Sequence, residues 1–308
     1  MRSPRLSIAL ALLLASCGGR VSPPPAREFD GPAALRSAER QVAFGPRIPG
    51  TEAHAAMAAW LDSLSRTKAD TVLVDRWIHV TRTGDSLPMV NVLARFNPDA
   101  ERRILYLAHW DTRPRADAAG STDSLAPVPG ANDGASGVAI LIGVMEALAA
   151  APPAVGVDLL FVDGEDYGSF SPERHDVLIG SLRYAANVPP PGKPDFAVVW
   201  DMVGGAGVRI GVESQGQVAA PDVIERVWST AERMGYGHIF VRQSIGAITD
   251  DHEPLIKAGI RAIDVIGWPF AHWHTPDDTI DKLSVESLEA VGNVAIAVIR
   301  EMGDGRER

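Results

Sequence analysis

Histidine and carboxylate residues follow the short apolar runs of this sequence. They are His109-Trp110-Asp111 after residues 103–108, Asp163-Gly164-Glu165-Asp166 after 157–162, Asp201 after 196–200, and His272-Trp273-His274 in the loop after 261–266. Asp133 adds a carboxylate directly before a helix-like apolar segment. Neutral imidazoles with two or three carboxylates and no thiolate form a nitrogen and oxygen donor set that suits Zn²⁺ and leaves a position open for water or a substrate carbonyl. These residues therefore predict a zinc site built from distant segments.

Glu165 and Asp166 are adjacent in the chain. Neighbours in a regular strand point to opposite faces, but at a turn after Gly164 both side chains can face one crevice. One carboxylate on the metal and its neighbour free to move a proton would divide the work between Lewis acid and general base. Burial and like charge at such a site would raise the pKa of the free carboxylate towards the working pH.

The elements that position these residues alternate between strand-like and helix-like segments. The apolar runs lack period-two alternation, which indicates strands covered on both faces. Helical patterns are expected at 51–66, 135–149, 221–234 and 284–300, and segment 71–96 is expected to add antiparallel strands at one edge. We therefore predict an α/β fold: a single domain, residues 31–303, with a mainly parallel twisted β-sheet flanked by helices on both faces. Ligands of such sheets bind beyond the carboxyl ends of the strands.

Composition excludes several classes of function. The 308 residues carry 29 Lys and Arg against 39 Asp and Glu, a net charge of -10. Such an acidic surface repels phosphate backbones, so nucleic acid is not an expected partner. The sequence has no G-x-S-x-G motif, and its single cysteine, Cys17, lies near the N-terminus. A serine or cysteine hydrolase is therefore not expected.

The first residues predict export. Arg2 and Arg5 precede a short apolar stretch, and the residues before Cys17 resemble the lipobox of bacterial lipoproteins. We interpret 1–16 as a lipoprotein signal peptide, 17–30 as a lipidated Cys17 with a flexible tether, and 304–308 as a tail. The predicted location is the periplasmic face of the cell envelope, at the outer membrane, because no Asp follows Cys17. The alternative is a plain secretory peptide with an incidental cysteine.

Six motifs in order carry a family resemblance. They are AHWDT (108–112), PGANDGASG (129–137), VDGEDYG (162–168), WDMVG (200–204), DDHEPL (250–255) and HWHTPDD (272–278). Together they resemble the motifs of the zinc aminopeptidase superfamily, clan MH, and imply its zinc exopeptidase (phosphorylase/hydrolase-like) fold. The segment 163–186 resembles more narrowly the glutaminyl-peptide cyclotransferase branch. The resemblance covers residues from about 35 to about 300, nearly all of the chain after the tether.

The resemblance implies a role for particular residues. Asp133, Asp166 and His274 correspond to the ligands of a single zinc, and Glu165 to the residue that shuttles the proton. Four more positions correspond to the surroundings of the metal, namely Asp201 and Asp250 in an acidic hydrogen-bonded set and Trp273 and Phe170 as walls of the substrate pocket. The implied reaction converts the N-terminal glutamine of peptides or proteins to pyroglutamate and releases ammonia.

Two other functions remain open at this stage. In the two-metal aminopeptidase branch, His109 and Asp201 would complete a second zinc site, Asp133 would bridge both ions, and Asp111 would orient His109. Glu165 would then activate a metal-bound water. The ligand set therefore fits one zinc or two. A non-catalytic peptide-binding lipoprotein is the third hypothesis, although it would not need Glu165 together with the zinc ligands.

Several residues have a second interpretation or a departure from the family pattern. Animal cyclotransferases carry a histidine where this chain has Asp264, which either takes over hydrogen bonding around Asp250 or is a buried acid with another partner. Taken alone, Asp133 fits a helix cap and Asp163 a turn. Arg113 and Arg115 are expected either at a pocket entrance or in a solvated loop. His252 and His272 lie beside motifs but match no ligand position. No site role is expected for His54, His79, His175 and His238.

Overall fold

The computed structural model describes residues 25–170 and 173–303. The predicted signal peptide, Cys17 and the tail at 304–308 lie outside the described residues. The helices are α1 (Gly31–Val42), α2 (Glu52–Lys68), α3 (Ala135–Ala150), α4 (Ile179–Ala186), α5 (Ser214–Ala219), α6 (Pro221–Arg233), α7 (His252–Lys257), α8 (Val285–Gly303) and the 3-10 turn η1 (Ile280–Lys282). The strands are β1 (Thr71–Val80), β2 (Ser86–Phe96), β3 (Arg103–His109), β4 (Gly156–Val162), β5 (Phe196–Asp201), β6 (Ile210–Glu213), β7 (Phe240–Gly246) and β8 (Ala262–Ile266).

The main sheet has the strand order β1-β2-β4-β3-β5-β8. Strands β4, β3, β5 and β8 are parallel, whereas β1 and β2 pair antiparallel with each other and β2 pairs antiparallel with β4. This arrangement confirms the predicted mainly parallel sheet with antiparallel strands at one edge. The sequence patterns did not indicate α1, α4, α5, α7 or the small parallel pair β6–β7, because these elements are short or partly polar.

The apolar runs form strands buried on both faces. In β3, Ile104, Tyr106 and Ala108 belong to the larger apolar core, and Leu105 and Leu107 belong to the core on the opposite face. A strand with apolar neighbours on both faces has no need for alternation, which is why these runs are continuous. Strand β1, at the open edge, is partly exposed along its whole length instead.

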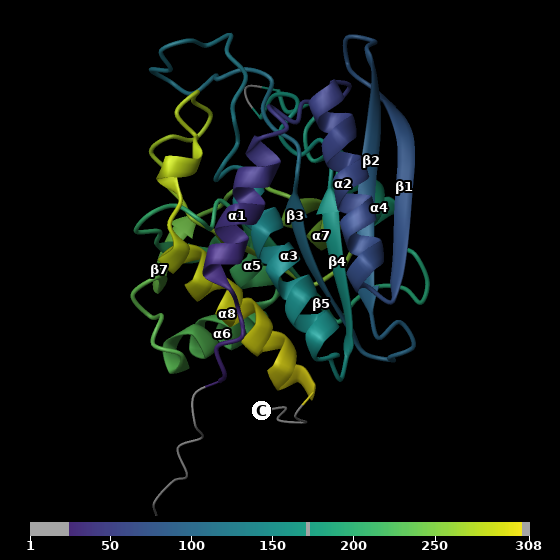
Figure 1. Ribbon diagram of the computed structural model, residues 1–308, viewed down its shortest axis with the longest axis vertical. Helices are drawn as coiled ribbons and strands as arrows, with labels where there is room; N and C mark the ends of the chain where they lie inside the picture. The colour runs from purple at the N-terminus through teal and green to yellow at the C-terminus, as the bar shows by residue number, and fades with distance from the viewer. Residues whose placement is uncertain (1–24, 171–172, 304–308) are drawn as a thin grey trace, which may run out of the picture.

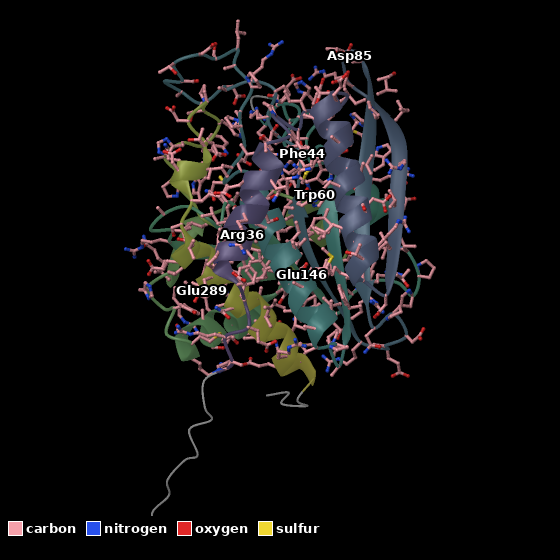
Figure 2. All side chains as sticks on the ribbon, in the orientation of Figure 1. Arg36, Phe44, Trp60, Asp85, Glu146 and Glu289 are labelled. Atoms are coloured by element: carbon pink, nitrogen blue, oxygen red, sulfur yellow. The ribbon has the colours of Figure 1, made fainter. Side chains whose placement is uncertain are left out.

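Helices cover both faces of the sheet. Figure 1 shows α1, α2, α3 and α8 on the near face, with α4 and α7 behind the strands. The ring of Phe44, just after α1, meets that of Trp60, in the middle of α2, with centroids 5.9 Å apart, at the upper part of the near face in Figure 2. None of the helices within the described ranges is long and apolar enough to cross a membrane.

The parallel strands all end at one edge of the sheet. The chain runs from β3 through α3 to β4 on one side of β3, and later returns to β5 on the other side. The strand order therefore reverses at β3, and the loops after β3 and β5 separate there to leave a crevice. His109 ends β3 and Asp201 ends β5, so both side chains lie at this crevice.

Helix α3 lies close to β5 because residue 137 is glycine. A Cβ at Gly137 would lie 2.0 Å from the carbonyl oxygen of Trp200, whereas one at Gly143 in the same helix would meet the Phe29 ring. We predict that Gly137→Ala lowers the free energy of unfolding by about 1–3 kcal/mol, because backbone must move. Urea unfolding of the metal-free protein measures this.

Gly237→Ala is the control, because a Cβ at Gly237 would meet only Glu232, at an ordinary contact distance of 3.5 Å. Equal free energies of unfolding for the two variants would contradict the close approach of α3 to β5.

Candidate active site

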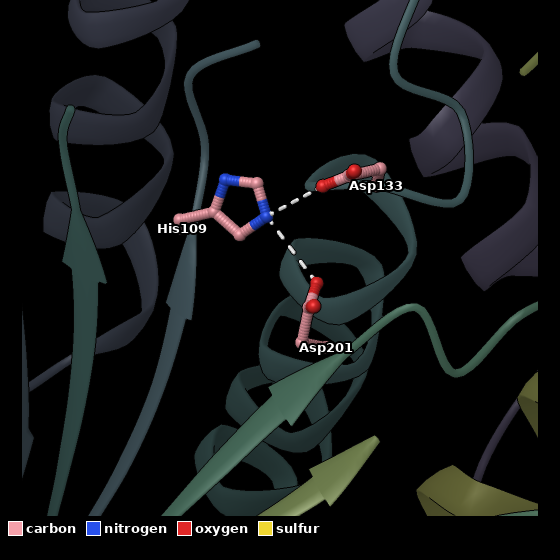
Figure 3. Close-up of side chains that lie close together, drawn as sticks. All are labelled: His109, Asp133 and Asp201. Carbon is pink, nitrogen blue, oxygen red and sulfur yellow. Dashed lines mark hydrogen bonds and ion pairs between the residues drawn. The ribbon is translucent and has the colours of Figure 1, made fainter. Parts of the chain in front are cut away.

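His109 faces two carboxylates at the carboxyl ends of the parallel strands. Its Nε2 lies 3.1 Å from Asp133 Oδ1 and 3.2 Å from Asp201 Oδ1, and Figure 3 shows the three side chains converging from β3, the start of α3 and β5. All three residues are buried. A single ring N–H can donate to only one of these oxygens at full strength, so the arrangement favours a positive charge between them.

A second trio shares Asp133. His274 Nε2 lies 3.2 Å from Asp166 Oδ1 and 3.8 Å from Asp133 Oδ2. The other ring nitrogen, Nδ1, lies 2.9 Å from Asp117 Oδ1. In neutral imidazole, a proton on Nδ1 that is donated to Asp117 leaves a lone pair on Nε2, directed at two carboxylates.

The donor atoms of this second trio fit a metal ion. Lone pairs that face one another in a buried site repel unless a cation lies between them. Tetrahedral zinc with ligands at about 2.0–2.2 Å brings donor atoms to roughly 3.2–3.6 Å from each other. The measured 3.2 and 3.8 Å bracket this range. The trio Asp133, Asp166 and His274 can therefore hold zinc with little rearrangement, and so can His109, Asp133 and Asp201.

Asp133 does not act as a helix cap. The N-cap of α3 is Gly134, and no side chain makes a capping hydrogen bond there. Gly134 has φ +97°, and a Cβ at this position would lie 2.9 Å from the carbonyl oxygen of Asp111. The left-handed turn directs the Asp133 carboxylate towards the two histidines instead. His274 also has a left-handed backbone, with φ +53°, a strain that is common at functional sites.

Buried charged residues fix the loops that carry these carboxylates. Asp111 accepts the backbone N–H groups of Glu165 and Asp166, each at 3.1 Å. Asp278 accepts the N–H groups of Asn132 and Asp133 at 2.8 and 3.0 Å. Each carboxylate thus accepts hydrogen bonds from two adjacent backbone N–H groups. The backbone of each loop is fixed in this way, and its side chains are free to face the crevice.

Arg47 holds the loop before Asp133 from the other side. Its guanidinium is fully buried and donates to the carbonyl oxygens of Trp110, Pro129 and Gly130 at 3.3, 2.6 and 2.7 Å. Burial lowers the pKa of Arg47 to about 10, so it stays cationic at neutral pH. Its positive charge lies beneath the acidic site and offsets part of the repulsion there.

The crevice is a pocket with a polar floor and an apolar wall. The floor is formed by Asp133, Glu165, Asp166, Asp201, Asp250 and His274. The wall is formed by Phe170, Met202, Ile248, Ile266, Trp268 and Trp273. The Trp273 ring stacks on His274 with centroids 3.6 Å apart and meets Trp268 edge to face at 5.2 Å. A small apolar group with a polar end fits such a pocket.

Burial and like charge raise the pKa values of the carboxyl groups on the floor. Burial, aided by the charges of Asp166 and Asp250, raises the pKa of Glu165 well above its usual value. Burial also raises the pKa of Asp201 to about 7, although the hydrogen bond from His109 opposes this shift. Burial alone would lower the pKa of His274, but the charge of Asp166 and the hydrogen bond to Asp117 raise it to about 9. Perturbed groups clustered in one pocket are typical of active sites.

Asp264 lies beneath Asp250, away from the pocket. Both of its oxygens lack a hydrogen-bond partner among the described residues, and burial followed by the charge of Asp250 raises its pKa well above the usual range. A donor atom of His252 lies within 4.8 Å of both acids, and His252 Nε2 lies 3.2 Å from Glu213. Asp264 is thus a buried acid beside Asp250, and its surroundings favour the neutral form of its carboxyl group.

Most of the residues singled out in the sequence meet at the pocket. His109, Asp111, Asp133, Glu165, Asp166, Phe170, Asp201, Asp250, Trp273 and His274 all line the pocket or contact its floor. His272 instead lies against Phe270. Asp163 is more than a turn residue, because it forms a buried ion pair with His54 at 2.8 Å beneath the 164–166 turn. Sequence reasoning missed Asp117, Arg47, Asp278 and Trp268, which match no ligand spacing.

Known proteins with similar sequences or structures include glutaminyl cyclases and an aminopeptidase. The model of Peptidase family M28 matches residues 91–299. Glutaminyl-peptide cyclotransferase from Bos taurus is 26% identical over 81% of this chain and 77% of the bovine protein. Glutaminyl cyclase from Porphyromonas gingivalis has a TM-score of 0.86 and 35% identity over 90% of this chain and 100% of its own. A structure described as a leucine aminopeptidase precursor from Bacteroides thetaiotaomicron has a TM-score of 0.86 and 33% identity over 91% of this chain and 98% of its own.

The raised pKa of Asp201 gives the metal-free protein a testable pH dependence. Its folded-state pKa of about 7 lies above the ordinary value of 3.8, so its contribution to stability is complete below the ordinary value and is lost as pH rises to about 7. The Asp201→Asn variant has no carboxyl group to ionise at this position, so it does not lose this stability as pH rises. Relative to the unchanged protein, we expect the variant to gain about 1–3 kcal/mol in free energy of unfolding between pH 5 and pH 8.

Urea unfolding in the presence of a chelator at the two pH values measures the difference. Asp195→Asn, at a surface ion pair with Arg102, is the control and should show no such gain. If the free energies of unfolding of Asp201→Asn and the unchanged protein differed by the same amount at both pH values, the raised pKa of Asp201 would be refuted.

Proposed function

Because the chain belongs to peptidase family M28, we propose that it is a zinc-dependent glutaminyl-peptide cyclotransferase. It converts the N-terminal glutamine of peptides or proteins to pyroglutamate and releases ammonia. The observation that supports this most directly is the position of Glu165, buried on the pocket floor beside Asp133, Asp166 and His274 and opposite an aromatic wall. The similar glutaminyl cyclases point to the same reaction.

The pocket suits an N-terminal glutamine side chain. Phe170, Trp268 and Trp273 contact the methylene groups of the substrate, and the acidic floor attracts its α-amine. Asp133, Asp166 and His274 would hold zinc, which would supply a Lewis acid for the side-chain carbonyl of the glutamine. The aromatic wall folds the side chain back towards the amine, which brings the two reacting groups together.

Glu165 moves the proton. Its carboxylate takes a proton from the attacking α-amine as the new nitrogen–carbon bond forms, and it gives this proton to the leaving amide nitrogen, which departs as ammonia. The carboxylate is unchanged at the end of the reaction. Burial raises its pKa above that of an ordinary carboxyl group, which makes the carboxylate a stronger base than an exposed glutamate.

Asp201 and Asp250 assist Glu165 in this proposal. Both line the pocket, and burial raises the pKa of each. In their protonated form they donate hydrogen bonds to the negative charge that develops on the substrate oxygen. Asp264 is a further buried acid beside Asp250, and Asp111 supports the Glu165 turn.

One zinc, held by Asp133, Asp166 and His274, is the stoichiometry that we propose. A second candidate function is a di-zinc aminopeptidase that removes N-terminal residues by hydrolysis. The trio His109, Asp133 and Asp201 favours it, because its donor atoms lie as close together as those of the first trio. In that case Asp133 would belong to both ligand sets and Glu165 would act as the base towards a water molecule.

The catalytic unit, residues 31–303, works in the cell envelope in this proposal. The signal peptide at 1–16 directs export, and lipidated Cys17 anchors the protein in the membrane through the tether that follows it. The predicted tether ended at residue 30, but Glu28 and Phe29 already pack on the folded unit. The anchor places the pocket at the periplasmic face of the outer membrane, where it meets the N-termini of exported peptides and proteins.

Glu165→Gln tests the chemistry. The glutamine has nearly the same shape but cannot take up a proton, so we expect the rate to fall by about 10²–10⁴ while zinc stays bound. Mass spectrometry of H-Gln-Ala and H-Leu-Ala incubated with zinc-loaded protein measures this. The unchanged protein should remove the mass of one ammonia from the glutamine peptide.

Glu173→Gln is the control, because Glu173 is exposed and pairs with Arg82 outside the pocket; this variant should keep full activity. Release of free leucine from H-Leu-Ala would favour the aminopeptidase instead. Loss of neither ammonia nor leucine would refute both enzymes and favour a binding module.

Two histidine substitutions test the metal count. We expect His274→Ala to lose the bound zinc and His109→Ala to keep one zinc per chain, because only His274 belongs to the proposed trio. Elemental analysis after gel filtration measures the stoichiometry. Two zinc ions in the unchanged protein, reduced to one by His109→Ala, would establish the di-zinc site.

A further inference from the structure

We infer that Arg113 is a positioning residue, which acts through Asp117 on the zinc-ligand geometry of His274. The inference rests on the zinc site proposed above. Sequence reasoning placed Arg113 either at the pocket entrance or in a solvated loop. The structure contradicts both interpretations, because Arg113 is buried and does not line the pocket.

Arg113 joins two carboxylates that belong to the site. Its Nε and one terminal nitrogen donate to the two oxygens of Asp117, at 2.7 and 2.5 Å. The other terminal nitrogen donates to Asp166 Oδ1 at 2.8 Å and to the Asp166 carbonyl oxygen at 3.1 Å. A planar guanidinium fixes both partners in one orientation, which an ammonium group cannot do.

Asp117 transfers this orientation to His274. One oxygen of Asp117 accepts from Arg113 and lies 2.9 Å from His274 Nδ1. A carboxylate at Nδ1 holds the proton on that nitrogen and directs the Nε2 lone pair to the metal position. Asp117 is itself half exposed, so without Arg113 it would be free to turn into solvent. Arg113 therefore decides whether His274 keeps its ligand geometry.

The backbone strengthens the same connection. Ala118, next to Asp117, donates its N–H to the carbonyl oxygen of His274 at 3.3 Å, and Val128 donates to the Arg113 carbonyl oxygen at 3.1 Å. The guanidinium also lies over the Phe170 ring, 5.6 Å from its centroid. Segment 113–118 thus holds His274 at its ring and at its backbone, and Arg113 is the centre of this contact.

The four contacts of Arg113 leave little room for a role in substrate binding. Three guanidinium nitrogens are occupied by Asp117 and Asp166, and the side chain is 5% exposed. A substrate would have to displace one of these charged partners. An effect of Arg113 on the reaction must therefore pass through the residues that it holds.

Arg113→Lys tests the inference with the charge kept constant. Removing the positive charge altogether would also strengthen cation binding by simple electrostatics and would obscure the result. Lysine keeps the charge but cannot donate to both oxygens of Asp117 and to Asp166 together. We expect the zinc dissociation constant to rise roughly 10- to 100-fold, as for other partners of metal-bound histidine. Competition with a chromogenic chelator measures it.

Asp117→Ala and the double variant show whether Arg113 acts through Asp117. We expect Asp117→Ala to raise the zinc dissociation constant by a similar factor. The double variant should bind zinc no more weakly than the single variant that binds it less tightly. The visible spectrum of the Co²⁺-substituted protein should change in the same way in all three variants, because it reports ligand geometry. The inference would be overturned if the increases in the zinc dissociation constant multiplied in the double variant, or if the Co²⁺ spectra of the variants matched that of the unchanged protein.

Arg115→Lys is the matched control, since Arg115 is an exposed arginine in the same loop; it should bind zinc like the unchanged protein. An Arg113→Lys variant with normal zinc affinity and a raised KM would identify a substrate contact and overturn the inference. If the unchanged protein itself failed to bind zinc or to release ammonia, the proposed function would fail, whereas normal zinc binding by Arg113→Lys alone refutes only the positioning role.

Discussion

The concentration of buried carboxyl groups at one edge of the sheet is the constraint on which the rest of the site depends. Asp133, Glu165, Asp166, Asp201 and Asp250 share one pocket and are almost completely removed from water. Carboxylates in such a place raise one another's pKa or must be balanced by positive charge. The protein supplies His109, His274, Arg47 and Arg113 for this purpose, and it still leaves two clusters of donor atoms directed at a position for a cation.

The same chemistry explains how the loops are held. Asp111 and Asp278 use both carboxylate oxygens to accept adjacent backbone N–H groups, of residues 165–166 and 132–133 respectively. A carboxyl group that accepts hydrogen bonds from two adjacent amides stabilises a tight turn. The loops are therefore fixed by acids that bind no metal, and the acids that face the pocket do not have to fix the loops. Arg113 works in a similar way for Asp117 and Asp166.

Local sequence signals were sufficient for the sheet and for the residues at its edge. Continuous apolar runs indicated the parallel strands, and because parallel strands end together, His109, Glu165 and Asp201 were expected at one crevice. Long-range partners were beyond such signals. Arg47 contacts carbonyl groups more than 60 residues away, and Asp117 lies in a loop with no periodicity. The pairing of His54 with Asp163 likewise depends on how α2 lies over β1 and β2 and so reaches the loop after β4, which neither segment encodes alone.

The polar floor does not distinguish cyclisation from hydrolysis, because both proposed reactions need a polarised carbonyl and a base, the role proposed for Glu165. They differ in the nucleophile, which is the substrate's own amine or a water molecule. Cyclisation succeeds when the amine lies close to the carbonyl and water does not, so proximity and exclusion of water decide the outcome. Both depend on the wall of the pocket, where Trp273 stacks on His274 and is held edge to face by Trp268. The reaction is therefore set by aromatic residues that touch no metal, and the histidine on which Trp273 packs is the one that Asp117 and Arg113 hold in place.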